Sequence, residues 1–409
     1  MANRLVRGRA VLSVAMTVVL LAFGAPASAT ASEGSSATPA GDRLGESELG
    51  ELLDPIVAAG APGAAVRLDF GARVQTAAAG QADLRGNRPM RPELNYRAGS
   101  LTKPMVATVV LQLVGEGRLA LTDTVDRWLP GILPYGDRVT VRHLLTMTSG
   151  VPEYLRGRIA IDTFGLTPAR LRTWTPRELV ALVTDQPPTF AAGTGFEYSN
   201  TNYVLAGMIV EAVTGNRLGW ELTRRIFRPL GMRDTRFPVH HPAIAGRHAH
   251  GYSLPVDPQG SIGAGPLRDV TVLDPSFAWA SGNVTSDLAD LTRFLGALLA
   301  GRLLLPALLA EMTTPVDTGD PDASYGMGLE FIHTPCGTVV GHSGSIAGFH
   351  TIVLADEDGH RRFALMTNQY LHGPATAQAF NQAALALMRD LLPDTCSSAV
   401  AGRSLMARR

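Results

Sequence analysis

The chain has 409 residues, with 36 basic and 36 acidic side chains and 45% hydrophobic residues. That is enough apolar material for a large core in one or two domains. The formal net charge of zero argues against a nucleic-acid partner and against a membrane partner held by charge alone. We therefore expect a globular protein that binds no nucleic acid.

Residues 1–29 are typical of a secretory signal peptide, with a basic start, an apolar stretch over 11–25 and an Ala-Ser-Ala cleavage motif. A membrane anchor is the alternative, but Gly24 and Pro26 interrupt the apolar stretch before it could span a bilayer. Residues 30–43 are rich in small polar residues and are predicted to be a flexible leader. The mature protein is expected to be secreted, in the extracellular or cell-wall space, with no stable membrane span.

Hydrophobic periodicity divides the remaining chain into helices and strands. Helices are predicted over 48–59, 105–114, 140–147, 176–184, 202–213, 218–227, 288–299 and 375–391. Strands are predicted over 64–70, 74–79, 325–332, 337–341, 348–354 and 362–367. Strands near both ends with helices between them predict an α+β fold, in which one antiparallel sheet built from both termini is flanked by helices and carries an inserted, mainly helical domain. The expected boundaries are 44–115 plus 275–396 for the sheet domain and 116–274 for the helical domain.

Both cysteines, Cys336 and Cys396, lie in the C-terminal part of the chain. Export and an even number of cysteines favour one disulfide between them. No group of His, Cys and carboxylate residues has metal-ligand spacing, so neither a metal nor another cofactor is expected. Residues 397–409 are a C-terminal tail whose processing the sequence leaves open.

The only lysine in the chain is Lys103, and it follows Ser100 by three residues at the start of an apolar helix. Positions i and i+3 place the Ser100 hydroxyl and the Lys103 amine on one face of a helix. Burial can deprotonate a lysine but not an arginine, and a serine hydroxyl needs a nearby base to become a nucleophile. The pair is therefore a candidate nucleophile and base, although codon bias alone also produces arginine-rich chains with a stray lysine.

Two further stretches carry chemistry. Tyr198-Ser-Asn200 follows a loop rich in Pro and Gly and precedes a helix, where Asn200 could also be only a helix cap. His342-Ser-Gly-Ser345 follows an apolar strand, and its glycine would let the backbone approach a substrate. The alternative for this second stretch is a hairpin turn with an exposed histidine.

In this order, Ser100-x-x-Lys103, Tyr198-x-Asn200 and His342-x-Gly344 resemble the serine β-lactamase and penicillin-binding-protein superfamily. Tyr-x-Asn and His-x-Gly in the second and third positions are most similar to class C β-lactamases and secreted D-alanyl-D-alanine carboxypeptidases. The resemblance covers nearly all the mature chain. It extends to the stretches 141–150, 229–232 and 325–329, which carry no catalytic residue.

This resemblance implies an acyl-enzyme mechanism. Ser100 would attack a carbonyl carbon, Lys103 would act as the base, and Tyr198 would pass the proton to the leaving amine and then activate water. The backbone N–H groups of Ser100 and Ser345 would form the oxyanion hole.

The resemblance also implies the substrate-binding residues. Asn200 would hold the substrate amide and orient Lys103, and His342 would set the electrostatics beside Tyr198. Ser343 would meet the substrate carboxylate, and Gly344 and Ser345 would line the same strand.

One departure from the carboxypeptidase pattern concerns the residues after Tyr325-Gly-Met-Gly-Leu. These enzymes often carry an arginine there that grips the substrate's terminal carboxylate, whereas this chain continues with Glu330 and has no arginine in the strand. Glu330 would repel an anion if its side chain faced the site, but strand alternation allows it to point away, so this repulsion is not expected.

The sequence favours a D-alanyl-D-alanine carboxypeptidase-type enzyme that acts on a small peptide, ester or β-lactam substrate, and a monomer is expected. An esterase or β-lactamase with the same site is the first alternative, and a penicillin-binding sensor with little turnover is the second.

Overall fold

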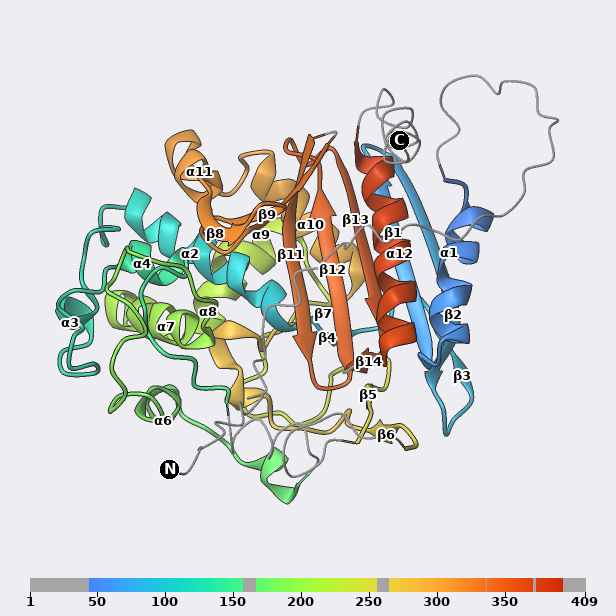
Figure 1. Cartoon of the computed structure of the whole chain (residues 1–409), viewed down its shortest axis with the longest axis horizontal. Coiled ribbons are helices and arrows are strands. Elements are labelled where there is room, and N and C mark those ends of the chain that lie inside the picture. The colour runs from blue at the N-terminus through green and yellow to red at the C-terminus, as the bar shows by residue number, and fades with distance from the viewer. Residues whose placement is uncertain (1–43, 157–166, 256–264, 336, 371–372, 393–409) are drawn as a thin grey trace, which may run out of the picture.

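A nine-stranded antiparallel sheet forms the centre of the molecule in the computed structural model, which describes residues 44–156, 167–255, 265–335, 337–370 and 373–392 (Figure 1). The strand order is β3-β2-β1-β13-β12-β11-β10-β9-β8. Its strands are β1 (Gly63–Phe70), β2 (Arg73–Asp83), β3 (Arg88–Pro89), β8 (Val316–Asp320), β9 (Ala323–Tyr325), β10 (Glu330–Thr334), β11 (Gly337–Ile346), β12 (Phe349–Ala355) and β13 (Arg361–Thr367). Ala64 of β1 pairs with Thr367 of β13, so the sheet joins the two ends of the chain.

Two helices cover one face of the sheet: α1 (Glu46–Ala58) and α12 (Pro374–Leu391) (Figure 1). Together with the facing side chains of β1, β12 and β13 they bury an apolar cluster that includes Leu53, Phe363 and Leu387. Burial of this area is the main force that holds both helices to the sheet.

The opposite face packs against α2 (Thr102–Gly115), α10 (Leu288–Leu299) and the helical part of the chain, around a second and larger apolar cluster. The other helices are α3 (Val125–Trp128), α4 (Val141–Leu145), α6 (Pro176–Ala181), α7 (Asn200–Thr214), α8 (Leu218–Leu222), α9 (Arg228–Leu230) and α11 (Pro306–Thr313). The helical turns are η1 (Gly99–Leu101), η2 (Pro168–Leu171), η3 (Thr223–Phe227), η4 (Pro275–Phe277) and η5 (Trp279–Ser281).

Two small sheets connect the chain segments around the catalytic region. The pair β4 (Tyr96–Arg97) and β7 (Thr285–Ser286) holds the segment before Ser100 against the segment before α10. The strands β5 (Tyr252–Ser253), β6 (Arg268–Asp269) and β14 (Gln369–Tyr370) form the other small sheet.

The predicted fold class is confirmed: the α+β arrangement with one antiparallel sheet is the β-lactamase/transpeptidase fold. The strand expected over 325–332 is instead two strands, β9 and β10, separated by a turn in which Gly328 has a φ of 79°. Asp287 rather than Ser286 caps α10, since the Asp287 side chain accepts a hydrogen bond from the Asp290 N–H. Helix α11 and strand β8 are absent from the sequence-based prediction. The domain boundaries remain a prediction.

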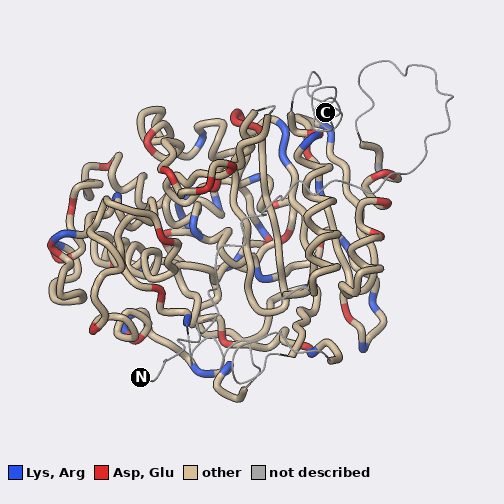
Figure 2. Tube along the Cα trace, viewed as in Figure 1, with Lys and Arg blue, Asp and Glu red and all other residues tan. Residues whose placement is uncertain are grey.

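Several predicted features lie outside the described residues: the signal peptide, the leader, Cys336, Cys396 and the C-terminal tail. Within the described residues, no helix combines the length and apolar character needed to cross a membrane. Basic and acidic residues are interspersed in both parts of the molecule (Figure 2).

Candidate active site

Ser100 lies in the turn η1, which leads directly into α2. Lys103 is in the first turn of α2 and is fully buried, and its Nζ lies 2.8 Å from Ser100 Oγ. The predicted i, i+3 contact between the hydroxyl and the amine is thus present in the structure.

The environment of Lys103 suits a neutral amine. Its Nζ also lies 2.8 Å from Asn200 Oδ1 and 2.8 Å from the Ser281 carbonyl oxygen. Both are pure acceptors, so they take the two N–H groups of a neutral amine, and the lone pair is left to accept the Ser100 proton. Burial lowers the pKa of Lys103 to about 7, although the charges of Glu153 and Glu330 act in the opposite direction. Lys103 can therefore serve as the base near neutral pH.

Tyr198 lies over this pair, at the end of the loop that precedes α7. Lys103 Nζ is 4.8 Å from the centroid of the Tyr198 ring, and the Tyr198 hydroxyl shares a hydrogen bond with Ser100. Burial raises the pKa of Tyr198 well above its usual value, while the bond to Ser100 opposes this shift. Tyr198 is thus a protonated phenol beside the nucleophile, placed where it could relay a proton.

Asn200 is the first residue of α7, and the cap position is Ser199, which makes no side-chain capping bond. The Asn200 side chain instead contacts Lys103 and Glu153. The alternative that Asn200 is only a helix cap is therefore wrong.

Glu153 is a site residue that the sequence analysis missed. It is 5% exposed, and its carboxylate accepts the Asn200 N–H at 2.6 Å, the Asn200 Nδ2 amide at 3.0 Å and the Leu155 N–H at 2.6 Å. These bonds fix the orientation of the Asn200 amide, so that Oδ1 points at Lys103. A lone Glu in the Pro-Glu-Tyr stretch after Gly150 gives no spacing signal, since Asn200, its partner in the site, is 47 positions away.

His342 lies within strand β11 and is 1% exposed, so the predicted alternative of a hairpin turn with an exposed histidine is wrong. Its Nδ1 lies 2.5 Å from the Ser343 carbonyl oxygen and its Nε2 lies 3.2 Å from the Tyr325 hydroxyl. A carbonyl can only accept, so Nδ1 carries the proton and Nε2 accepts from Tyr325. Burial lowers the pKa of His342, with Glu330 acting against it, which favours the neutral ring that these two contacts require.

Glu330 faces the site, contrary to the expectation that it points away. Its carboxylate accepts the Ser343 N–H at 3.0 Å and the Ser343 hydroxyl at 2.9 Å, and one oxygen lies 3.3 Å from His342 Nδ1. Register explains this orientation, because Glu330 pairs with Gly341 and is thereby next to the start of the His342 motif. The sequence could not supply this register.

Gly344 and Ser345 bring β11 against the turn that carries Ser100. A Cβ added to Gly344 would lie 2.1 Å from the Ala98 carbonyl oxygen, so this position requires glycine. A Cβ added to Gly99 would lie 3.0 Å from the Ser345 N atom, which places that N–H beside η1. The predicted pairing of Ser100 and Ser345 N–H groups in an oxyanion hole is consistent with this contact and remains a prediction.

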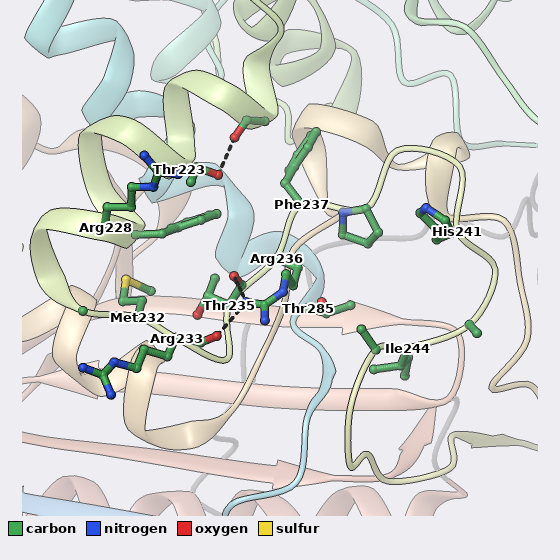
Figure 3. A pocket seen from close by; sticks show the side chains of 16 residues that line it. Thr223, Arg228, Met232, Arg233, Thr235, Arg236, Phe237, His241, Ile244 and Thr285 are labelled. Atoms are coloured by element: carbon green, nitrogen blue, oxygen red, sulfur yellow. Dashed lines mark hydrogen bonds between the residues drawn. The ribbon is translucent and has the colours of Figure 1, made fainter.

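A cavity of about 960 Å³ lies elsewhere, between η3, α9 and the segment that follows them (Figure 3). Ser100, Lys103 and Tyr198 do not line it. Its wall includes Thr285 and Arg236 (Figure 3). The Arg236 guanidinium donates to the carbonyl oxygens of Arg233 and Thr235. Among the described residues, no group of three or more His, Cys, Asp and Glu side chains could hold a metal ion.

The fold and the Ser100–Lys103 pair with Tyr198 define a serine hydrolase of the β-lactamase and penicillin-binding-protein type. The family model described as Beta-lactamase matches residues 49–387, and the chain belongs to that family. It is 34% identical to Esterase EstB of Burkholderia gladioli over 275 residues, which are 62% of this chain and 69% of that one. It is 30% identical to a penicillin-binding protein of Bacillus subtilis over 300 residues, or 71% of this chain, and spans 64% of the length of that relative.

Solved structures of similar fold include two amide-hydrolysing enzymes. A D-stereospecific amidohydrolase from Streptomyces sp. has a TM-score of 0.75 and 36% identity, with 83% of this chain and 98% of that chain covered. A D-amino acid amidase from Ochrobactrum anthropi SV3, complexed with D-phenylalanine, has a TM-score of 0.72 and 30% identity, with 83% and 98% covered.

Proposed function

We propose that this protein is a secreted acyl-enzyme hydrolase that cleaves amides and esters of D-amino acids. The observation that carries the proposal is the buried Lys103 amine, which lies 2.8 Å from Ser100 Oγ while two carbonyl oxygens occupy its N–H groups. This arrangement lets Ser100 attack a carbonyl carbon as its proton passes to Lys103. Tyr198 then protonates the leaving group and recovers a proton from Lys103, so the Ser100 proton is in effect transferred to the leaving group, and water releases the acyl group from Ser100.

The choice of substrate rests on Glu330 and on the similar structures. A substrate with a free terminal carboxylate would meet the Glu330 carboxylate, with no arginine bonded to Glu330 or Ser343 among the described residues. Like charges in a poorly solvated site repel, so this favours substrates without that carboxylate over a peptide that ends in free D-Ala-D-Ala. The D-stereospecific amidohydrolase and the D-amino acid amidase support the same choice, and Esterase EstB supports esters.

The test compares kcat/KM for four substrates: D-phenylalanine amide, L-phenylalanine amide, a neutral phenyl ester and a peptide ending in free D-Ala-D-Ala. We expect the D-amide and the ester to be cleaved at least ~10-fold more efficiently than the carboxylate peptide, as expected for an unpaired like charge. Ser100→Ala is the control and should abolish all four activities. Preference for the carboxylate peptide would favour the carboxypeptidase, and a lasting penicillin adduct without turnover would favour the sensor.

A further inference from the structure

Glu330 places a negative charge where carboxypeptidases of this type often place an arginine. It is the first residue of β10, it is 7% exposed, and both of its oxygens bond to Ser343 of the neighbouring strand β11. The Glu330 charge acts on Lys103 and on Tyr198, so it lies close enough to influence the reacting groups.

The bond to Glu330 changes what Ser343 can offer a substrate. A serine hydroxyl has one proton, and Ser343 donates that proton to Glu330 at 2.9 Å. Only the lone pairs of Ser343 Oγ remain available, so this oxygen acts as a hydrogen-bond acceptor toward a substrate. The expectation that Ser343 donates to a substrate carboxylate is therefore reversed: the Glu330–Ser343 pair is complementary to an N–H donor.

Among the described residues, no charged cation bonds to this pair. His342 is neutral, because Nδ1–H donates to the Ser343 carbonyl and Nε2 accepts from Tyr325. In the described part of the chain, no arginine side chain bonds to Glu330, Ser343 or His342. The Lys103 amine is directed at Ser100, Asn200 and Ser281.

The pair lies close to Tyr198, since one Glu330 oxygen is 3.3 Å from His342 Nδ1 and the Glu330 charge acts on Tyr198. Tyr198 is the group that would protonate the leaving amine, and the His342 ring centroid is 6.3 Å from the Tyr198 ring centroid. Ser343 is bonded to Glu330, and it lies in β11 two residues before Ser345 and the predicted oxyanion hole, so the two serines share one face of the strand. A leaving group beside Tyr198 would thus extend toward Ser343 and Glu330.

We propose that Glu330 and Ser343 form a subsite for an ammonium group carried by the leaving group of the substrate. This proposal rests on the proposed function and names its preferred substrates as amides of amines that carry a second, protonated amino group. In the reaction the Ser100 Oγ–carbon bond forms and the carbon–nitrogen bond breaks. The Ser100 proton moves to the departing nitrogen, and water then releases the D-amino acid and restores the Ser100 hydroxyl.

The test uses three amides of D-phenylalanine whose leaving amines have similar size and different charge. These are 1,2-diaminoethane (cation), propylamine (neutral) and glycine (anion). On the wild-type enzyme we expect kcat/KM to fall in that order, with about tenfold between cation and neutral amide, the size expected for one poorly solvated ion pair. In Glu330→Gln, the kcat/KM ratios of the cationic to the neutral amide and of the neutral to the anionic amide should both fall to about threefold or less, because the variant keeps the shape of the side chain and removes its charge.

Glu197→Gln is the matched control. It removes an equal charge next to Tyr198 in the sequence, from a pair with Arg156 that is partly exposed. The order of the three amides should be unchanged in this variant. An equal change in Glu197→Gln and Glu330→Gln would overturn the subsite in favour of a general charge effect, as would a wild-type preference for the glycine amide.

A second measurement needs no variant and no turnover. A fluorophosphonate labels an activated serine, and its reaction with Ser100 is followed by intact mass in the presence of propylammonium or propionate. Slower labelling with propylammonium alone supports the subsite, and equal protection by both ions or by neither overturns it. If Ser100 is labelled but no D-amide is cleaved, the proposed function fails while this result still decides the subsite.

Discussion

The two faces of the central sheet bury different kinds of side chain. Toward α1 and α12 the sheet buries an apolar cluster, in which Leu53, Phe363 and Leu387 are fully buried. Toward α2 and the helical part, it buries ionisable groups among apolar ones: Lys103 is 0%, His342 1% and Glu330 7% exposed. Burying the apolar side chains of the first face costs little free energy. Burying the ionisable side chains of the second face would be unfavourable if they were not paired.

The difference separates stability from chemistry along one sheet. On the catalytic face each buried charge has specific partners, and the burial that penalises charge is also what lowers the pKa of Lys103 to about 7. The apolar face buries fewer such groups: His350, which is 9% exposed, packs its ring against Phe380 of α12 and bonds to the Ser345 hydroxyl. Stability on this face depends mainly on the area buried. Changes on the catalytic face should therefore alter the reaction, and changes on the apolar face should alter the free energy of unfolding.

The largest effect is expected from Lys103→Arg. A guanidinium keeps the positive charge but cannot accept the Ser100 proton at any accessible pH. Acylation by a neutral ester should fall by at least ~1000-fold, or about 4 kcal/mol in the activation free energy. The rate of Ser100 acylation is measured by stopped flow.

Because arginine is bulkier than lysine, Lys103→Met serves as a second variant that removes the base without adding volume. Acylation near the wild-type rate in a folded Lys103→Arg variant would contradict the role of Lys103.

The next effect concerns the apolar face. Leu387→Ala in α12 leaves a cavity where a fully buried side chain packed, and it should lower the free energy of unfolding by about 3 kcal/mol. The control is Leu305→Ala, since Leu305 is 61% exposed and its loss should change stability by less than about 0.5 kcal/mol. Urea unfolding measures both. Below the unfolding transition kcat/KM should match the wild type, and a large loss of activity in folded Leu387→Ala would mean that the two faces are coupled.

Sequence patterns were sufficient for the parts of this structure that depend on local signals. Ser100 and Lys103 are three residues apart, and the paired strands β1 and β2 meet at Gly71, whose φ of 58° the turn requires. The motifs of Tyr198, Asn200 and His342 were visible as short strings of residues.

What the sequence could not give depends on contacts across long separations. Glu153 meets Asn200 across 47 residues, and the orientation of Glu330 depends on the register of β10 against β11. A shift of one residue in that register would turn Glu330 to the other face. The expectation of an outward-pointing Glu330 was wrong for this reason.

The smallest expected effect, Glu153→Gln, tests whether a buried charge tunes Lys103 from outside the reacting groups. Glu153 accepts three N–H bonds from Asn200 and Leu155, as an ionised carboxylate does, and its charge raises the pKa of Lys103. Removing the charge should lower the pKa of Lys103 further. The acidic limb of kcat/KM for a neutral ester, which follows the deprotonation of Lys103, should therefore move to lower pH. The plateau at high pH should also fall by about tenfold, because the glutamine amide cannot accept all three bonds and Asn200 loses its fixed orientation.

Glu211→Gln is the matched control. It removes a carboxylate that accepts the Leu218 N–H and that lies eleven residues, or about 16 Å, beyond Asn200 along α7. A limb that stays in place in Glu153→Gln while the plateau falls would show that Glu153 only orients Asn200, and a limb that moves equally in Glu211→Gln would show that the shift is not specific to the site.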